Sequence, residues 1–202
     1  MDLTLSIIPE KTAIKNGISN SCKMIINDFE DRKKFISILD YGCGKLRNTK
    51  YLINNGFNVS IIDTEKQINS QLSEIESLCL NYYYNIENIN LNQKYDVILF
   101  SFVLNVIPNA KERDNSLNNI YNLLNNEGLA YIEVRNSNFL KSLKYKVPYN
   151  DGVLTGNSKN KTFQKAYTME EFTTYLSNNN FEICSTKKTS SSLIAIVKRK
   201  DN

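Results

Sequence analysis

Histidine and tryptophan are both absent from this chain of 202 residues. Without an imidazole, the chain cannot use Ser-His-Asp or Cys-His catalysis, and it lacks the commonest metal ligand in proteins. Any reaction that this chain carries out must therefore proceed without histidine.

Cysteine is scarce, and its four positions include no C-x-x-C pair: Cys22, Cys43, Cys79 and Cys184. The spacing predicts neither a disulfide framework nor a zinc site, and we expect no bound metal.

Long apolar runs are also missing, so no stretch is suited to crossing a bilayer, and the N-terminus lacks the basic-then-apolar order of a signal peptide. We expect a cytoplasmic protein without a membrane partner. The formal net charge is only +4, which makes a weak case for a nucleic-acid partner.

The strands and helices that the sequence does predict alternate along the chain. Stretches rich in apolar, β-branched or aromatic residues predict seven strands, at 35–42, 57–63, 78–85, 95–104, 129–135, 181–188 and 192–200. Helical spacing predicts helices at 13–30, 46–55, 65–77, 112–128 and 168–180. This alternation favours an α/β fold with a mostly parallel sheet, and the short turn before the last strand makes that strand antiparallel.

We expect one domain, residues 1–202, without internal repeats. Residues 1–34 form a helical lead-in to the first strand. Residues 136–166 are polar and read as irregular, and a loop of this length in a small domain is usually functional or disordered. We therefore interpret this segment as a substrate loop or lid, with a solvated mobile loop as the alternative.

The stretch ILDYGCGKLRNTKYL, residues 38–52, joins the first strand to a helix through a Gly-x-Gly turn. A P-loop is excluded because it needs the pattern G-x-x-x-x-G-K-S/T. In this stretch the glycines are two residues apart, and no Lys-Ser or Lys-Thr pair follows them. A dinucleotide site is disfavoured because Arg47 stands where the third glycine is needed for close helix packing.

S-adenosylmethionine fits this stretch better, because its bound portion carries an ammonium, a carboxylate and a ribose but no phosphate. Asp40, at the head of the turn, suits the ammonium, and the backbone N–H groups of residues 42–46 suit the carboxylate. Asp63 ends the second strand, 21 residues beyond Gly42, where a carboxylate can bind both ribose hydroxyls. Tyr41 and Cys43 lie in the same turn and count with the cofactor-binding residues.

LDYGCG, followed by VSIID and YDVILFSFVLNVI, resembles the class I S-adenosylmethionine-dependent methyltransferases over about residues 36–135. The resemblance implies a Rossmann-like seven-stranded sheet with helices on both faces. It also implies cofactor contacts: Asp40, Gly42 and Gly44 for the methionine, Asp63 for the ribose, Thr64, Asn85 and Ile86 for the adenine, and Ser101 and Phe102 beside the sulfonium. Leu46 departs from the small residue that many such motifs carry, which puts the local turn geometry in question.

A narrower resemblance involves segments outside the cofactor motifs. KTAIKNGIS, FVLNVIPNAKERDNSL and DGVLTGNSKNKTFQKAYTMEEF are similar to bacterial methyltransferases associated with DNA phosphorothioation. The chain is shorter than those proteins, and the resemblance supplies no substrate.

Methyl transfer depends mainly on positioning, so a general base is optional and the absence of histidine is tolerated. SFVLN follows the fourth strand in place of the D/N/S-P-P-aromatic motif of DNA amino-methylases, and no Pro-Cys pair exists for cytosine-C5 methylation. The sequence therefore disfavours the standard DNA methylation reactions, and it assigns no catalytic residue.

Candidate residues for the methyl acceptor are spread along the chain. Asn105 either faces the substrate or caps a helix, and Arg135 either binds substrate or is a solvated strand-end charge. Segment 136–166 interleaves lysines with aromatic residues, an arrangement that suits the binding of phosphates and the stacking of bases. The lysines are Lys141, Lys144, Lys146, Lys159, Lys161 and Lys165. Gln164 and Lys165 are the first residues to test there. The N-terminal stretch EKTAIKNG, residues 10–17, is expected to close over the cofactor, with Lys11 near its carboxylate.

The acceptor itself stays open between a nucleic acid or nucleotide-like molecule, a small molecule and a protein. A non-catalytic subunit that binds S-adenosylmethionine is a further alternative, and the sequence does not indicate the oligomeric state.

Overall fold

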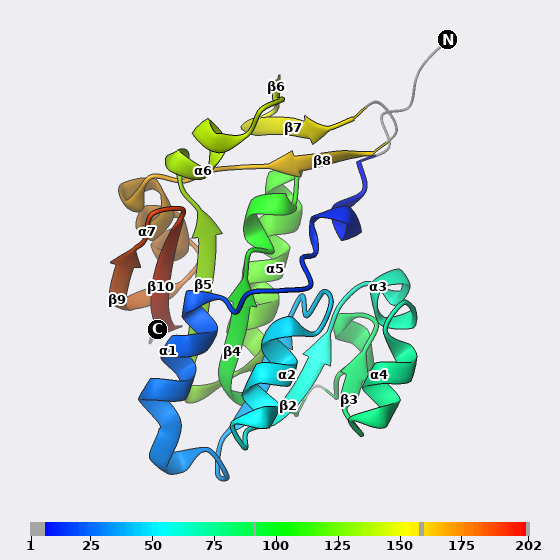
Figure 1. Ribbon diagram of the computed structural model, residues 1–202. Helices are drawn as coiled ribbons and strands as arrows, with labels where there is room; N and C mark the ends of the chain where they lie inside the picture. Colours follow the sequence, from blue (N-terminus) through cyan, green and yellow to red (C-terminus); the bar gives the residue numbers. More distant parts are fainter. Residues whose placement is uncertain (1–6, 91, 158–159, 201–202) are drawn as a thin grey trace.

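The computed structural model describes residues 7–90, 92–157 and 160–200. A seven-stranded sheet runs through its centre in the order β3-β2-β1-β4-β5-β10-β9 (Figure 1). Its strands are β1 (Ser37–Tyr41), β2 (Asn58–Ile62), β3 (Asn81–Tyr83), β4 (Tyr95–Ser101), β5 (Leu124–Arg135), β9 (Phe181–Lys188) and β10 (Ser192–Arg199).

Strands β1 to β5 pair in parallel, whereas β10 is antiparallel to both of its neighbours. The parallel strands all end at one edge of the sheet, the edge at which ligands bind in open α/β folds. The predicted Rossmann-like α/β fold with an antiparallel C-terminal strand is confirmed.

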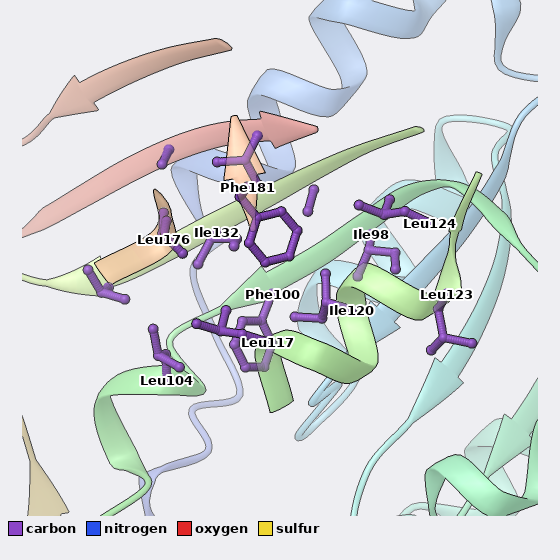
Figure 2. Packing of buried hydrophobic residues seen from close by; sticks show 14 of the residues in the cluster. Ile98, Phe100, Leu104, Leu117, Ile120, Leu123, Leu124, Ile132, Leu176 and Phe181 are labelled. Carbon is purple, nitrogen blue, oxygen red and sulfur yellow. The ribbon is translucent and has the colours of Figure 1, made fainter. Parts of the chain in front are cut away.

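Helices cover both faces of the sheet because alternate residues of the central strands point to opposite sides. Ile98 and Phe100 of β4 join a core beneath α5 (Ala110–Leu123) and α7 (Met169–Asn178) (Figure 2). Val97 and Leu99, on the other face, pack under the remaining helices of the sheet: α1 (Asn20–Phe29), α2 (Arg47–Asn54), α3 (Glu65–Asn69) and α4 (Leu72–Ser77).

Several predicted helix boundaries were wrong. Helix α1 begins only after Ser19, whose hydroxyl accepts the N–H of Cys22. Residues 7–18 before it contain only a short 3₁₀ helix, η1 (Pro9–Thr12). The helix expected over 65–77 breaks into α3 and α4 between Asn69 and Leu72. Helix α5 ends at Leu123, and β5 continues from there.

Segment 136–166 is more regular than predicted. It contains α6 (Ser137–Ser142) and a three-stranded antiparallel sheet of β6 (Val147–Tyr149), β7 (Gly152–Gly156) and β8 (Lys161–Gln164). This small sheet lies across the carboxyl edge of the large sheet (Figure 1). Its apolar side is anchored by Leu154 and Phe163, which are buried, and Lys159 lies outside the described residues.

Further 3₁₀ turns connect the elements, namely η2 (Glu30–Arg32), η3 (Ile86–Asn88) and η4 (Leu104–Val106). Within the described ranges, no helix combines the length and the apolar character needed to span a membrane. Nor do three or more metal-ligating side chains gather there in a way that would hold an ion.

Candidate functional site

A cavity of about 520 Å³ opens at the carboxyl edge of the large sheet. Most of the residues predicted to bind the cofactor line it, although they come from four different connections: Tyr41, Gly42, Gly44, Asp63, Thr64, Asn85, Ile86, Ser101 and Phe102. Such a volume is typical of small-molecule and cofactor sites.

The Gly-x-Gly turn forms one wall of the cavity, and its glycines are needed for two reasons. Gly42 has φ +82°, and a Cβ there would lie 2.3 Å from Cγ2 of Val103. Gly44 has φ +56°, and a Cβ would come within 3.3 Å of Ala13. The turn therefore passes close to two other segments in a conformation that side chains disfavour.

Leu46, the departure noted in the sequence motif, also has positive φ, +59°, and its side chain is fully buried. Its N–H donates to the carbonyl of Cys43, which closes the turn directly before α2. Burial of the leucine offsets the cost of a left-handed conformation that glycine would adopt without strain.

The backbone N–H groups of this turn are mostly engaged within the protein, which corrects the prediction that residues 42–46 receive the cofactor's carboxylate. Gly42 and Cys43 donate to the carbonyl of Ile62, and Gly44 donates to Oδ2 of Asp63 at 2.8 Å. The N–H of Leu46 is also used. The side chains of Lys45 and Arg47 line the cavity and can bind an anion at this turn.

Asp63 follows β2 and lines the cavity as predicted. Its Oδ1 accepts the N–H of Thr64 at 2.7 Å, while Oδ2 accepts the N–H of Gly44. Burial raises the pKa of Asp63, and these two N–H donors oppose that increase. Each carboxylate oxygen can accept a second hydrogen bond, so Asp63 remains able to bind hydroxyl groups.

Asp40 lies behind the cavity wall. Its carboxylate is 2% exposed and accepts the hydroxyl of Thr49 at 2.6 Å. Burial raises its pKa to about 6, against the effect of that hydrogen bond. Cys43 is buried beside it, and neither residue lines the cavity. The geometry therefore gives Asp40 a role in holding the turn against α2.

The connection after β4 supplies the opposite wall. Ser101 ends the strand, and its hydroxyl oxygen is buried without a hydrogen-bond partner among the described residues. Phe102 follows with φ +61°, and its N–H donates to the carbonyl of Glu133 at 2.7 Å. An unpartnered hydroxyl beside a ring in a strained backbone conformation is typical of a ligand-binding position.

Of the residues predicted to contact the acceptor, only Arg135 lines the cavity. Asn105 and Gln164 are buried against each other, joined by a 3.0 Å hydrogen bond from Nδ2 to Oε1. Lys165 is also buried, and its ammonium pairs with Glu171 at 2.6 Å and Asp151 at 3.3 Å. These three residues fasten β8 to η4 and α7, outside the cavity lining.

The N-terminal stretch expected to close over the cofactor, residues 10–17, contributes four residues to the cavity lining. Lys11 is exposed and not part of the lining, whereas its neighbours Glu10, Thr12, Ala13 and Ile14 are. Two contacts from the start of α2 hold this segment. A guanidinium nitrogen of Arg47 donates to the carbonyl of Gly17, and Oδ1 of Asn48 accepts the N–H of Ser19.

One side of the cavity was missed from the sequence altogether. Helix α5 contributes Glu112, Ser116 and Asn119, and Nδ2 of Asn119 donates to the hydroxyl of Tyr41 at 3.3 Å. Their spacing of three and four residues places them on one helix face. Polar residues at that spacing are equally typical of the solvent-exposed face of an amphipathic helix. The sequence therefore gave no indication that these three residues line a cavity.

The comparisons with known proteins agree with this site. A family model described as a methyltransferase domain matches residues 18–186, most of the chain. A search among curated proteins gave no match.

Solved structures share the fold at low identity. A S-adenosylmethionine-dependent methyltransferase from Methanosarcina mazei is 18% identical with a TM-score of 0.71, covering 88% of this chain and 98% of that chain. One from Clostridium acetobutylicum is 16% identical with a TM-score of 0.68, covering 90% and 91%. The 1,6-didemethyltoxoflavin-N1-methyltransferase of Burkholderia thailandensis, solved with bound 1,6-didemethyltoxoflavin and S-adenosylhomocysteine, is 18% identical with a TM-score of 0.66, covering 90% of this chain and 78% of that chain.

The family match extends over the glycine turn, the acid after β2 and the connection after β4, which all line one cavity. The chain therefore belongs to the class I S-adenosylmethionine-dependent methyltransferases, with S-adenosylmethionine as its cofactor.

Proposed function

We propose that this enzyme transfers a methyl group from S-adenosylmethionine to a small molecule that binds in the same cavity. The observation that carries the proposal is the single cavity lined both by the cofactor motifs and by Arg135, Glu112 and the segment 10–14. A macromolecular acceptor would have to insert one group into this space, whereas a small molecule can enter it whole.

The residues present fit the cofactor. Asp63 keeps acceptor capacity for the ribose hydroxyls, and Gly42 and Gly44 allow the turn to pass close to Val103 and Ala13, which also line the cavity. Asn85 and Ile86 line the part of the cavity next to Asp63 and Thr64, which suits the adenine. Ser101 and Phe102 would flank the sulfonium, and Lys45 with Arg47 would receive the carboxylate.

S-adenosylmethionine, when bound, would supply an electrophilic methyl group to the nucleophile of the acceptor, with S-adenosylhomocysteine as the leaving group. The protein's own task is to align the acceptor and exclude water. Glu10, the residues 12–14 and Phe102 line the cavity and would help to exclude water from it. An acceptor amine needs only to arrive neutral, so transfer to an amine does not require a dedicated base.

A nucleic-acid acceptor is the second candidate, and the exposed lysines of segment 136–166 are the observation in its favour. Lys141, Lys144 and Lys146 are exposed around Tyr145, but none of them lines the cavity. Lys165 is engaged in ion pairs inside the protein. This separation between the exposed lysines and the cavity favours the small molecule.

The narrower resemblance to phosphorothioation-associated methyltransferases receives no support from the comparisons, and we do not take an acceptor from it. The cytoplasmic location stays a prediction.

The function is tested first by calorimetry with S-adenosylmethionine, S-adenosylhomocysteine and NAD. Binding of both sulfur nucleosides and not of NAD is expected, and binding of NAD alone would contradict the assignment. A labelled methyl group is then offered with cell extract separated into small molecules, RNA, DNA and protein. We expect label in the small-molecule fraction, and label confined to RNA or DNA would favour the second candidate instead.

A further inference from the structure

We propose that the guanidinium of Arg135 binds an anionic group, a carboxylate or a phosphate, on the methyl acceptor. This inference rests on the proposed function and specifies the chemical class of its substrate.

The guanidinium of Arg135 is held in one place by two aromatic rings. Its central carbon lies 3.9 Å from the ring centroid of Phe102 and 4.2 Å from that of Phe139, the first on the loop after β4 and the second in α6. Stacking between two rings fixes the plane of the guanidinium while leaving its N–H edge available. A guanidinium held in this way can bind a carboxylate or a phosphate through two parallel hydrogen bonds.

Arg135 has no counter-ion of its own among the described residues. No ion pair or side-chain hydrogen bond involves its guanidinium there. The nearby carboxylate of Glu133 is fully buried and occupied, because Oε2 accepts the N–H and hydroxyl of Ser21 and Oε1 accepts the hydroxyl of Ser192. A half-buried cation without a partner that lines a cavity is a candidate site for an anion.

A second guanidinium strengthens the positive character of this side. Arg47 lies 5.8 Å from the ring centroid of Phe102 and also lines the cavity. Burial lowers the pKa of Arg135 to about 10, the charge of Glu133 opposes this decrease, and proximity to Arg47 adds to it. A bound anion would relieve that repulsion.

The sheet order separates Arg135 from the cofactor's polar groups. Asp63 follows β2 and Asn85 follows β3, on one side of β1, whereas Arg135 ends β5, two strands away on the other side. Phe102, after the intervening β4, stands beside Arg135. In this order, the methyl group would be near Phe102, and an acceptor anchored by its anion at Arg135 would present its nucleophile there.

The first experiment asks whether Arg135 serves the acceptor or the cofactor's own carboxylate. Calorimetry measures the binding of S-adenosylhomocysteine and of 5′-methylthioadenosine, which lacks the amino-acid end, to wild type, Arg135→Gln and Arg47→Gln. Arg47→Gln is the comparison variant, because Arg47 is the proposed partner of the cofactor's carboxylate. We expect Arg135→Gln to bind both nucleosides within about twofold of wild type. A loss of tenfold or more for S-adenosylhomocysteine alone would assign Arg135 to the cofactor and overturn the proposal.

The second experiment uses inorganic phosphate and acetate as probes, added to the protein already saturated with S-adenosylhomocysteine. NMR follows the Nε–H signal of Arg135 and yields a dissociation constant for each anion. We expect at least one anion to shift that signal saturably, and Arg135→Gln to weaken its binding, followed on neighbouring backbone amides, at least tenfold. Arg32→Gln, which removes a guanidinium stacked 5.2 Å over Phe29 outside the cavity, is the matched control and should change nothing.

The two probes distinguish the two sources of the anion. Tighter binding of phosphate indicates a phosphorylated acceptor, and tighter binding of acetate indicates a carboxylate. No saturable shift with either anion would overturn the inference while leaving the proposed function intact, provided that S-adenosylhomocysteine still binds. If that nucleoside fails to bind the wild type, the proposed function itself is wrong.

Once the labelled product is available, its structure gives an independent check. Mass spectrometry should identify a carboxylate or a phosphate in it, and Arg135→Gln should lower its yield at least tenfold. A product that contains neither group contradicts the proposal.

Discussion

The cavity has two sides that were built in different ways. The cofactor side consists of short segments that each follow a strand directly, such as the turn at Gly42 and the acid at Asp63. The acceptor side combines Arg135, the Phe102 ring and helix α5 with residues 10–14 from the N-terminal segment. The first is made of local motifs at a fixed edge of the sheet, and the second depends on how distant segments pack.

This difference explains how the chain can share a cofactor with proteins that are under 20% identical to it. Strand ends and glycine turns place cofactor groups with few residues, whereas the opposite wall varies with loop packing. Mutations on the two sides should therefore give different signatures, loss of nucleoside binding on one and loss of transfer on the other.

The largest effect is expected for Gly42→Ala on the cofactor side. The added methyl group would overlap Val103, and alanine disfavours φ +82°. We expect no measurable binding of S-adenosylhomocysteine by calorimetry, and a loss of about 3 kcal/mol in the free energy of unfolding. Gly17→Ala is the control, because Gly17 has nearly the same φ, +81°, with nothing within 4 Å of the new Cβ. Equal losses in both variants would show that close approach at Gly42 is unimportant.

Asp63→Ala is expected to weaken binding of S-adenosylhomocysteine and of 5′-methylthioadenosine at least about 100-fold, because both contain the ribose and two charge-assisted hydrogen bonds are lost. Thermal unfolding checks that the variant is folded. Glu65→Ala, an exposed acid two residues away, should leave both affinities unchanged. Unchanged affinity in Asp63→Ala would remove Asp63 from the site.

Asp40→Asn tests whether the acid beneath the turn is structural. The pKa of Asp40 is about 6 in the native state, above its ordinary value of 3.8, so the folded protein holds this proton more tightly than the unfolded chain. Its ionisation therefore costs stability as the pH rises from 4 to 7, by about 3 kcal/mol. Urea unfolding at several pH values should show wild type losing that much relative to Asp40→Asn, and a difference that does not vary with pH would refute the assignment.

The smallest effect concerns Leu46, which is buried behind the glycine turn on the cofactor side. Leu46→Ala and Leu46→Gly both lose a fully buried side chain, but only glycine relieves the left-handed backbone. We expect both variants to be less stable than wild type, and Leu46→Gly to be more stable than Leu46→Ala by about 1 kcal/mol in urea unfolding. The reverse order would mean that the turn relaxes to negative φ once the leucine is removed.

The sequence predicted the strands of the sheet because apolar, β-branched runs bounded by turns carry their own signal. The sequence-based prediction was less complete where one segment forms hydrogen bonds or packing contacts with another. The turn's N–H groups were expected to be free, but Ile62 and Asp63 of the neighbouring strand end already accept them. Polar residues 136–166 were expected to be irregular, yet only Leu154 and Phe163 need burial to anchor a small sheet.

The sequence by itself determined the fold class, the cofactor and the positions of Gly42, Gly44 and Asp63, because each depends on a short stretch and on the strand before it. Only the tertiary structure decided that Lys165 is buried in ion pairs while Arg135, thirty residues earlier, faces the cavity between two rings. Both are basic residues near the carboxyl edge in the sequence reading. Contacts between segments far apart in the chain decide which of the two side chains forms an ion pair with a carboxylate of the protein. The periodicity of apolar residues does not predict those contacts.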